Sequence, residues 1–177
     1  MTEFDSISSE VFVVKKTLIS MGDKEVEFIK SKAIKSPRKR ARICAHQSNS
    51  DALHEMFIAI SPKSYIRPHK HFEKSESFHI IEGVVDVIIF DEYGEINDVI
   101  KLGEKASGRN YYYKLSESKF HTLIIHSDIL VMHEITNGPF ERDQSVYASF
   151  SPEEDDAEAV NQYIENLSIK SEEFSRG

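Results

Sequence analysis

The spacing of apolar residues changes twice along the chain. Near the N-terminus, Val26, Ile29 and Ala33 recur every three to four residues, which is the period of an α-helix. This spacing predicts a helix near residues 21–35, and Pro37 ends it because proline cannot continue the helical hydrogen-bond pattern. A short apolar strand, Val11 to Val14, precedes this helix and could dock on a sheet edge.

Between residues 41 and 150 the apolar residues come in short runs separated by turn residues. The strands expected from these runs are 52–60, 65–71, 77–90, 98–102, 111–115, 121–125, 129–136 and 145–150. Such a series of short strands predicts an all-β sandwich or barrel. Asp91-Glu92-Tyr93-Gly94 is typical of a hairpin turn, because glycine takes a positive φ without strain.

The helical period returns near the C-terminus. Ser151 is followed by Pro152 and two glutamates, which is typical of a helix start because serine caps the first turn and proline fits its first position. The apolar stripe of this helix would consist of Val160, Tyr163, Ile164 and Leu167. We therefore expect a C-terminal helix over residues 152–168.

Length and patterning fit one domain over residues 1–177. Its parts would be an N-terminal strand and helix at 11–36, a β-barrel at 41–150 and the C-terminal helix at 152–168. A chain of this size buries roughly 70% of the surface that its unfolded form exposes, so it needs no disulfide to fold.

Composition narrows the setting and the partners. The single cysteine, Cys44, and the lack of an apolar leader at the start favour the cytoplasm. The net charge of −8 argues against a nucleic-acid partner. No apolar run approaches the roughly 20 residues that a membrane-spanning helix requires.

Three side chains that commonly bind metals lie in one short segment. If residues 68–71 form a strand, His69 and His71 point to the same face, and Glu76 could fold back beside them. Two imidazoles and one carboxylate suit one divalent ion of zinc, iron, manganese or nickel, and they leave positions open for water or substrate. The simpler interpretation is a set of polar residues on an exposed edge strand.

The segment His69-x-His71-x4-Glu76-x6-Gly83 resembles the first signature motif of the cupin superfamily. Cupins are double-stranded antiparallel jelly rolls that carry a metal inside the barrel. The resemblance therefore implies a cupin-type jelly roll with a helix near each end of the chain.

The resemblance also implies a fourth ligand, a histidine on a later strand. His121 is the best candidate, although serines and Ile125 replace the Pro, Gly and Asn that the second cupin motif carries around this histidine. The rivals of His121 are His126 and His133. Strand alternation puts His121 on the face of Leu123 and Ile125, which separates it from His126.

More narrowly, the chain resembles the WbuC family of cupin-fold metalloproteins, which are encoded among bacterial O-antigen and polysaccharide biosynthesis genes. The resemblance covers about residues 20–165. Its landmarks, in order, are Ser36-Pro37-Arg38-Lys39-Arg40-Ala41-Arg42, His46, the metal-ligand segment, Phe90-Asp91-Glu92-Tyr93-Gly94, His121, Asn137-Gly138-Pro139-Phe140 and Ser151-Pro152-Glu153-Glu154. It implies one metal per chain and a role in sugar or surface polysaccharide metabolism.

Five further residues are candidates for substrate contact. Arg40 and Arg42 could bind a phosphate or carboxylate, for example of a nucleotide sugar, although a basic run is as often a solvated face. His46 belongs to the WbuC resemblance, which implies that it lines the pocket or orients a ligand. Tyr111 and Tyr113 would share one face of their strand, where they reach the pocket or simply pack.

Three functions fit these residues. In the first, the metal acts as a Lewis acid on a sugar-derived substrate in isomerase, epimerase or lyase chemistry, or supports oxygenase chemistry. In the second, the protein is a non-catalytic small-molecule-binding or regulatory cupin. In the third, it is a metal-free nucleotide-sugar isomerase or epimerase with a histidine base and a tyrosine acid. We also expect a homodimer that pairs through Val11 to Val14 and the C-terminal helix.

Overall fold

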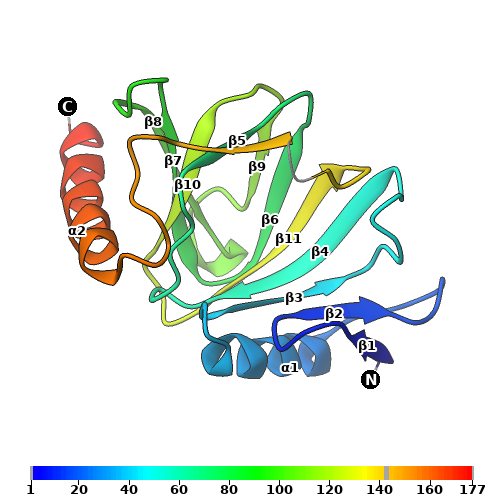
Figure 1. The fold of residues 1–177 in the computed structure, drawn as a ribbon. Helices are drawn as coiled ribbons and strands as arrows, with labels where there is room; N and C mark the ends of the chain where they lie inside the picture. The colour runs from blue at the N-terminus through cyan, green and yellow to red at the C-terminus, as the bar shows by residue number, and fades with distance from the viewer. Residues whose placement is uncertain (1, 142–143, 177) are drawn as a thin grey trace.

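Two β-sheets face each other and enclose the barrel interior, and one helix packs outside each sheet (Figure 1). This arrangement is seen in a computed structural model that describes residues 2–141 and 144–176. The larger sheet, in spatial order, contains β1 (Phe4–Ser6), β2 (Val11–Val14), β3 (Arg40–Cys44), β4 (Leu53–Ile60), β11 (Leu130–Asn137), β6 (Glu76–Glu82) and β9 (Tyr112–Leu115). The smaller sheet contains β12 (Ser145–Tyr147), β5 (His69–His71), β10 (Phe120–Ile125), β7 (Val84–Phe90) and β8 (Ile96–Gly103).

Eight of these strands pair in a nested order. β4 pairs with β11, β5 with β10, β6 with β9, and β7 with β8, and all four pairs are antiparallel. The first strand of the series thus pairs with the last, and the two middle strands form a hairpin. Nested pairing across two facing sheets is the jelly-roll topology, so the expected all-β, cupin-like jelly roll is confirmed.

Helix α1 (Asp23–Lys35) covers the outer face of the larger sheet, as its predicted apolar stripe requires. Val26, Ile29 and Ala33 are buried there. The helix begins after Gly22, whose N–H donates to the Glu25 carboxylate over 3.1 Å. The predicted strand Val11–Val14 is β2, and it lies between β1 and β3 rather than at the edge of the sheet.

The predicted single strand 77–90 is wrong, because it is two strands that belong to different sheets. β6 ends at Glu82, β7 begins at Val84, and Gly83 between them has a φ of 89°. A Cβ at this position would lie 2.4 Å from the carbonyl oxygen of Ile129. Only glycine therefore allows the chain to pass from one sheet to the other here.

The C-terminal helix α2 spans Ala157–Phe174, so the predicted range 152–168 is wrong at both ends. The cap is Asp156, whose carboxylate accepts from the Ala159 N–H over 3.1 Å. Ser151 instead donates to the Ala148 carbonyl over 2.8 Å. Two ion pairs, Arg67 with Glu153 and Arg40 with Glu154, hold the residues after Ser151 in a turn that precedes the helix. These tertiary contacts outweigh the local capping pattern.

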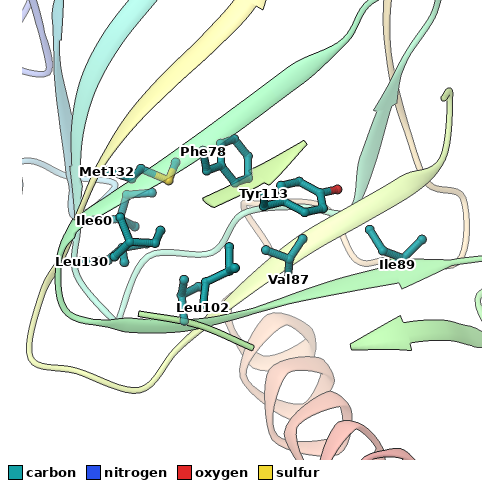
Figure 2. Close-up of a cluster of buried hydrophobic side chains, with 10 residues drawn as sticks. Ile60, Phe78, Val87, Ile89, Leu102, Tyr113, Leu130 and Met132 are labelled. Atoms are coloured by element: carbon teal, nitrogen blue, oxygen red, sulfur yellow. The ribbon is translucent and has the colours of Figure 1, made fainter. Parts of the chain in front are cut away.

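At one end of the barrel the interior is entirely apolar. Side chains from both sheets meet there, and we call this region the apolar half: Ile60, Ile80, Val85, Leu102, Leu130 and Met132 (Figure 2). All six are nearly inaccessible to solvent. A short 3₁₀ turn lies at Lys105–Ser107. None of the described helices is long and apolar enough to cross a membrane.

Candidate metal centre

At the other end of the barrel, β5 and β10 bring three histidines together. His121 lies directly opposite His69 in the strand register, and His71 is two residues further along β5 on the same face. One ring nitrogen of each histidine lies within 4.8 Å of the others. Together with Glu76 they form what we call the histidine half of the barrel interior.

Each of these rings is fixed through its Nδ1 atom. His69 Nδ1–H donates to the Arg67 carbonyl over 2.9 Å, and His121 Nδ1–H donates to the Lys119 carbonyl over 3.0 Å. Because a carbonyl only accepts, the proton of the neutral ring is on Nδ1 and the Nε2 lone pair is free. His71 Nδ1 shares a hydrogen bond of 2.9 Å with the Ser145 hydroxyl. Metal-binding histidines in proteins are oriented in this way.

Glu76, the first residue of β6, completes the group. Its side chain is buried, with Oε1 2.7 Å from His121 Nε2 and Oε2 3.7 Å from His71 Nε2. Yet neither Glu76 Oε1 nor His121 Nε2 has a hydrogen-bond partner of normal geometry in the described chain. Buried polar atoms without a partner are rare and costly. A cation between the carboxylate and the imidazoles would satisfy both atoms, so these residues fit a divalent metal.

The electrostatics of His69 and His71 also suit a metal. Burial, reinforced by the neighbouring His121, lowers the pKa of His69 to about 3, and burial lowers the pKa of His71. Both rings are therefore neutral at physiological pH, as a metal ligand must be. Burial alone would lower the pKa of His121 and raise that of Glu76, but their mutual attraction reverses both shifts.

The other candidate histidines lie elsewhere. His126 Nε2 is 2.9 Å from a carboxylate oxygen of Asp86, and His133 stacks on Phe57 with ring centroids 4.7 Å apart. His79 is exposed on the face of β6 opposite Glu76. The structure thus places His121, rather than its rivals, beside His69 and His71.

The candidate substrate residues are divided between this site and other surfaces. Tyr113 is buried inside the barrel, where its ring packs on Phe78 at 5.4 Å. Tyr111 lies outside β9, is half exposed and contacts His79, so the expectation that it accompanies Tyr113 into the barrel is wrong. A strand break before Tyr112 ends the alternation on which that expectation rested.

Arg40, Arg42 and His46 are not part of the histidine cluster. Arg40 donates to the Tyr65 carbonyl over 2.9 Å and pairs with Glu154, so its guanidinium anchors the segment before α2. Arg42 is exposed on β3. His46 stacks on His54, with ring centroids 4.0 Å apart and planes within 11°.

Two polar residues of the barrel interior were missed by sequence reasoning. His54 shares a strand face with Met56, Ile58 and Ile60, and Glu134 shares one with Leu130 and Met132. Burial and the nearby Glu76 charge raise the pKa of Glu134 to about 8. In each case the signal was present, because a polar residue occupies an inward position of an otherwise apolar strand face.

Comparison with known proteins adds the following similarities. Residues 22–102 match a family described as "Domain of unknown function (DUF6016)". No curated protein matches the sequence. Protein SO0799 from Shewanella oneidensis is similar in structure, with 10% identity and a TM-score of 0.47 over 55% of this chain and 63% of that one.

Two further solved structures are similar. The DMSP lyase DddQ from Ruegeria pomeroyi has 15% identity and a TM-score of 0.49, over 64% of this chain and 54% of that one. A cupin superfamily protein from Desulfitobacterium hafniense has 13% identity and a TM-score of 0.40, over 55% and 76% of the two chains. This chain thus spans less than two thirds of the Shewanella and Ruegeria proteins.

Proposed function

We propose that this chain is a cupin-type metalloprotein in which His69, His71, Glu76 and His121 hold one divalent ion. The observation that carries the proposal is the convergence of three histidines whose Nδ1 atoms are already engaged, beside a buried carboxylate that lacks a partner. Zinc, iron, manganese and nickel all accept this set of nitrogen and oxygen donors.

The proposed role of the site is to bind and polarise an oxygen atom of a small polar ligand. A bound divalent ion would act there as a Lewis acid. The chain itself supplies the orientation, because Arg67, Lys119 and Ser145 keep the three rings in place. The apolar half below the site leaves no polar partner for water, so a ligand would be held at the histidine half.

The finer parts of the proposal rest on the WbuC resemblance. On that ground we infer that the ligand is sugar-derived, with nucleotide sugars among the candidates. We also infer that the protein serves bacterial surface polysaccharide (O-antigen) biosynthesis in the cytoplasm. The ordered landmarks from Ser36 to Glu154 support this assignment. A homodimer remains part of the proposal, with α2 as its expected contact, because β2 is paired on both sides within its own sheet.

A second function, metal-free isomerisation or epimerisation, is favoured by one contact. His121 Nε2 and Glu76 Oε1 are only 2.7 Å apart, and a carboxylate beside an imidazole can serve as a proton-transfer pair. The buried hydroxyl of Tyr113 would then be the acid. This alternative predicts full activity without a stoichiometric metal.

The deciding experiment is elemental analysis of protein purified without a metal-affinity tag. We expect about one divalent ion per chain in the wild type and loss of most of it in His71→Ala. The matched control is His79→Ala, since His79 is exposed on the other face of β6 and should not affect metal content. Metal-free wild-type protein that takes up none of the four ions would refute the proposal and favour the metal-free alternative.

A further inference from the structure

Buried polar atoms without a hydrogen-bond partner gather in the histidine half. In the described chain six buried side-chain atoms lack a partner, and four of them belong to Glu76, His121, His54 and Tyr113. The proposed metal would account for Glu76 and His121 only. His54 Nε2 and the Tyr113 hydroxyl still need a partner, because leaving a buried polar group unpaired is destabilising.

Tyr113 presents its hydroxyl to the histidine half. Its side chain is 5% exposed, and its oxygen points away from Ile60, Leu130 and Met132 (Figure 2). Burial, followed by the Glu76 charge, raises the pKa of Tyr113, so the hydroxyl stays protonated and can donate a hydrogen bond. If Tyr113 had only a packing role, phenylalanine would be more stable at this position, because it has no hydroxyl that is buried without a partner.

His54 lies on the side of Glu76 that is opposite to Tyr113. In the larger sheet His54 on β4 is directly opposite Thr136 on β11, which is in turn opposite Glu76 on β6. Opposed residues share a sheet face, so His54 and Glu76 both face the barrel interior. The His46 ring stacks on His54 at 4.0 Å, and His46 is itself fixed by the Glu55 N–H, which donates to its Nδ1 over 3.2 Å.

These positions place two unpaired groups on either side of Glu76, one of the proposed metal ligands. β9, which carries Tyr113, is next to β6, whereas β4, which carries His54, lies beyond β11. A ligand that satisfies both groups while an oxygen atom meets the metal must therefore extend across the barrel and carry polar atoms along its length. A ligand with one carboxylate, such as acetate, would satisfy the metal alone.

We propose that His54 and Tyr113 bind the two ends of the metal-centre ligand, and that this ligand is a small polyhydroxylated molecule. The inference rests on the proposed metal function and adds two contact residues for the proposed ligand. His54 is a ligand-binding residue in this scheme, and the His46 ring is a positioning residue that keeps it in place.

The test compares two monoanions that differ in their hydroxyl groups, acetate and D-gluconate. Both would be titrated into protein loaded with Co²⁺, with binding followed by the visible absorption of the metal and metal content checked afterwards. We expect the wild type to bind gluconate at least about tenfold more tightly than acetate. Tyr113→Phe and His54→Phe should each weaken gluconate binding about fivefold to tenfold and leave acetate binding unchanged.

Neighbouring residues provide matched controls. Tyr112→Phe alters the exposed tyrosine next to Tyr113, and His79→Phe alters an exposed histidine outside the barrel, so neither should change gluconate binding. Tyr113→Phe should also leave the thermal stability of the metal-free protein equal or higher, because the lost hydroxyl has no partner in the chain. A merely structural tyrosine would lower it.

The outcomes separate the two proposals. This inference is overturned, and the metal function stands, if Co²⁺ binds but acetate and gluconate bind equally. The same holds if Tyr113→Phe and His54→Phe affect the binding of both anions to the same extent. If Co²⁺ does not bind at all, the metal function fails and the inference fails with it. Should His54→Phe not fold, Tyr113→Phe decides, since removing one oxygen atom leaves the packing of the ring intact.

Discussion

β6, β10 and β11 run through both halves of the barrel interior and contribute opposite kinds of side chain to the two ends. β10 carries His121 at one end and Ile125 at the other, and β11 runs from Leu130 in the apolar half to Glu134 beside the site. In the apolar half every inward side chain gains from leaving water. In the histidine half several inward groups are buried without a partner, which costs free energy.

The comparison teaches that one end of these strands contributes to stability, whereas the other end of the same strands contributes to binding. A polar group in the apolar half would have no hydrogen-bond partner to offset the cost of its burial. The histidine half keeps polar groups that can form hydrogen bonds with a ligand. Natural proteins commonly accept such local cost where they bind or react. Changes in the two halves should therefore have separable effects on folding and on binding.

The largest expected effect is on stability, from a change in the apolar half. Leu130 is fully buried, so Leu130→Ala should lower the free energy of unfolding by about 2–5 kcal/mol through lost burial and the cavity left behind. Urea denaturation would measure the loss. The number of metal ions bound per folded chain should not change. A variant that is fully folded and yet binds less metal would contradict the separation of the two halves.

The second effect is a pH dependence that originates beside the site. The pKa of Glu134 is about 8 in the folded chain, against an ordinary value of 4.5. Between these values the folded state holds a proton that the unfolded state releases, so stability falls as pH rises from about 4.5 to about 8. In metal-free Glu134→Gln this fall should shrink by about 3 kcal/mol between pH 5 and pH 8.

Urea unfolding with chelator present, at both pH values, would measure this difference. Glu117→Gln is a suitable control, because the Glu117 side chain lies in a loop and is exposed rather than buried. An unchanged pH slope in Glu134→Gln would show that Glu134 is ionised in the folded protein.

The smallest effect is on the orientation of one ligand. The Ser145 hydroxyl is the partner of His71 Nδ1, so Ser145→Ala should weaken metal affinity about tenfold without changing the apolar half. Competition with a chelator would measure the affinity, and thermal unfolding of the metal-free protein would confirm that folding is intact. An affinity equal to that of the wild type would mean that the ring is held by packing alone.

Much of the fold follows from local pattern. The series of short apolar runs predicts the strands, and the spacing of Val26, Ile29 and Ala33 predicts α1, because these signals depend on neighbours in sequence. The strand break at Gly83 and the start of α2 were not predicted correctly, because they depend on residues that are remote in sequence. The turn at Gly83 depends on the closeness of Ile129, and the segment after Ser151 is held by Arg40 and Arg67, both remote in sequence.

The candidate site divides in the same way. His69, His71 and Glu76 lie in one segment and the cupin resemblance points to them, while strand alternation distinguishes His121 from His126. His54 and Glu134 escape such reasoning, because a single polar residue on a strand becomes significant only when the register shows what it faces. Tyr111 shows the converse, since alternation has no force where the strand has not begun.

The two hydrogen bonds that fix His69 and His121 differ in kind from the one that fixes His71. Their acceptors are the main-chain carbonyls of residues two positions earlier, which every amino acid provides. The alignment of these two rings is therefore robust to mutation, since replacing the Lys119 side chain leaves its carbonyl in place. Ser145 alone provides a side chain, so a saturation scan of the three partner positions should find the loss of ring alignment concentrated at that one residue.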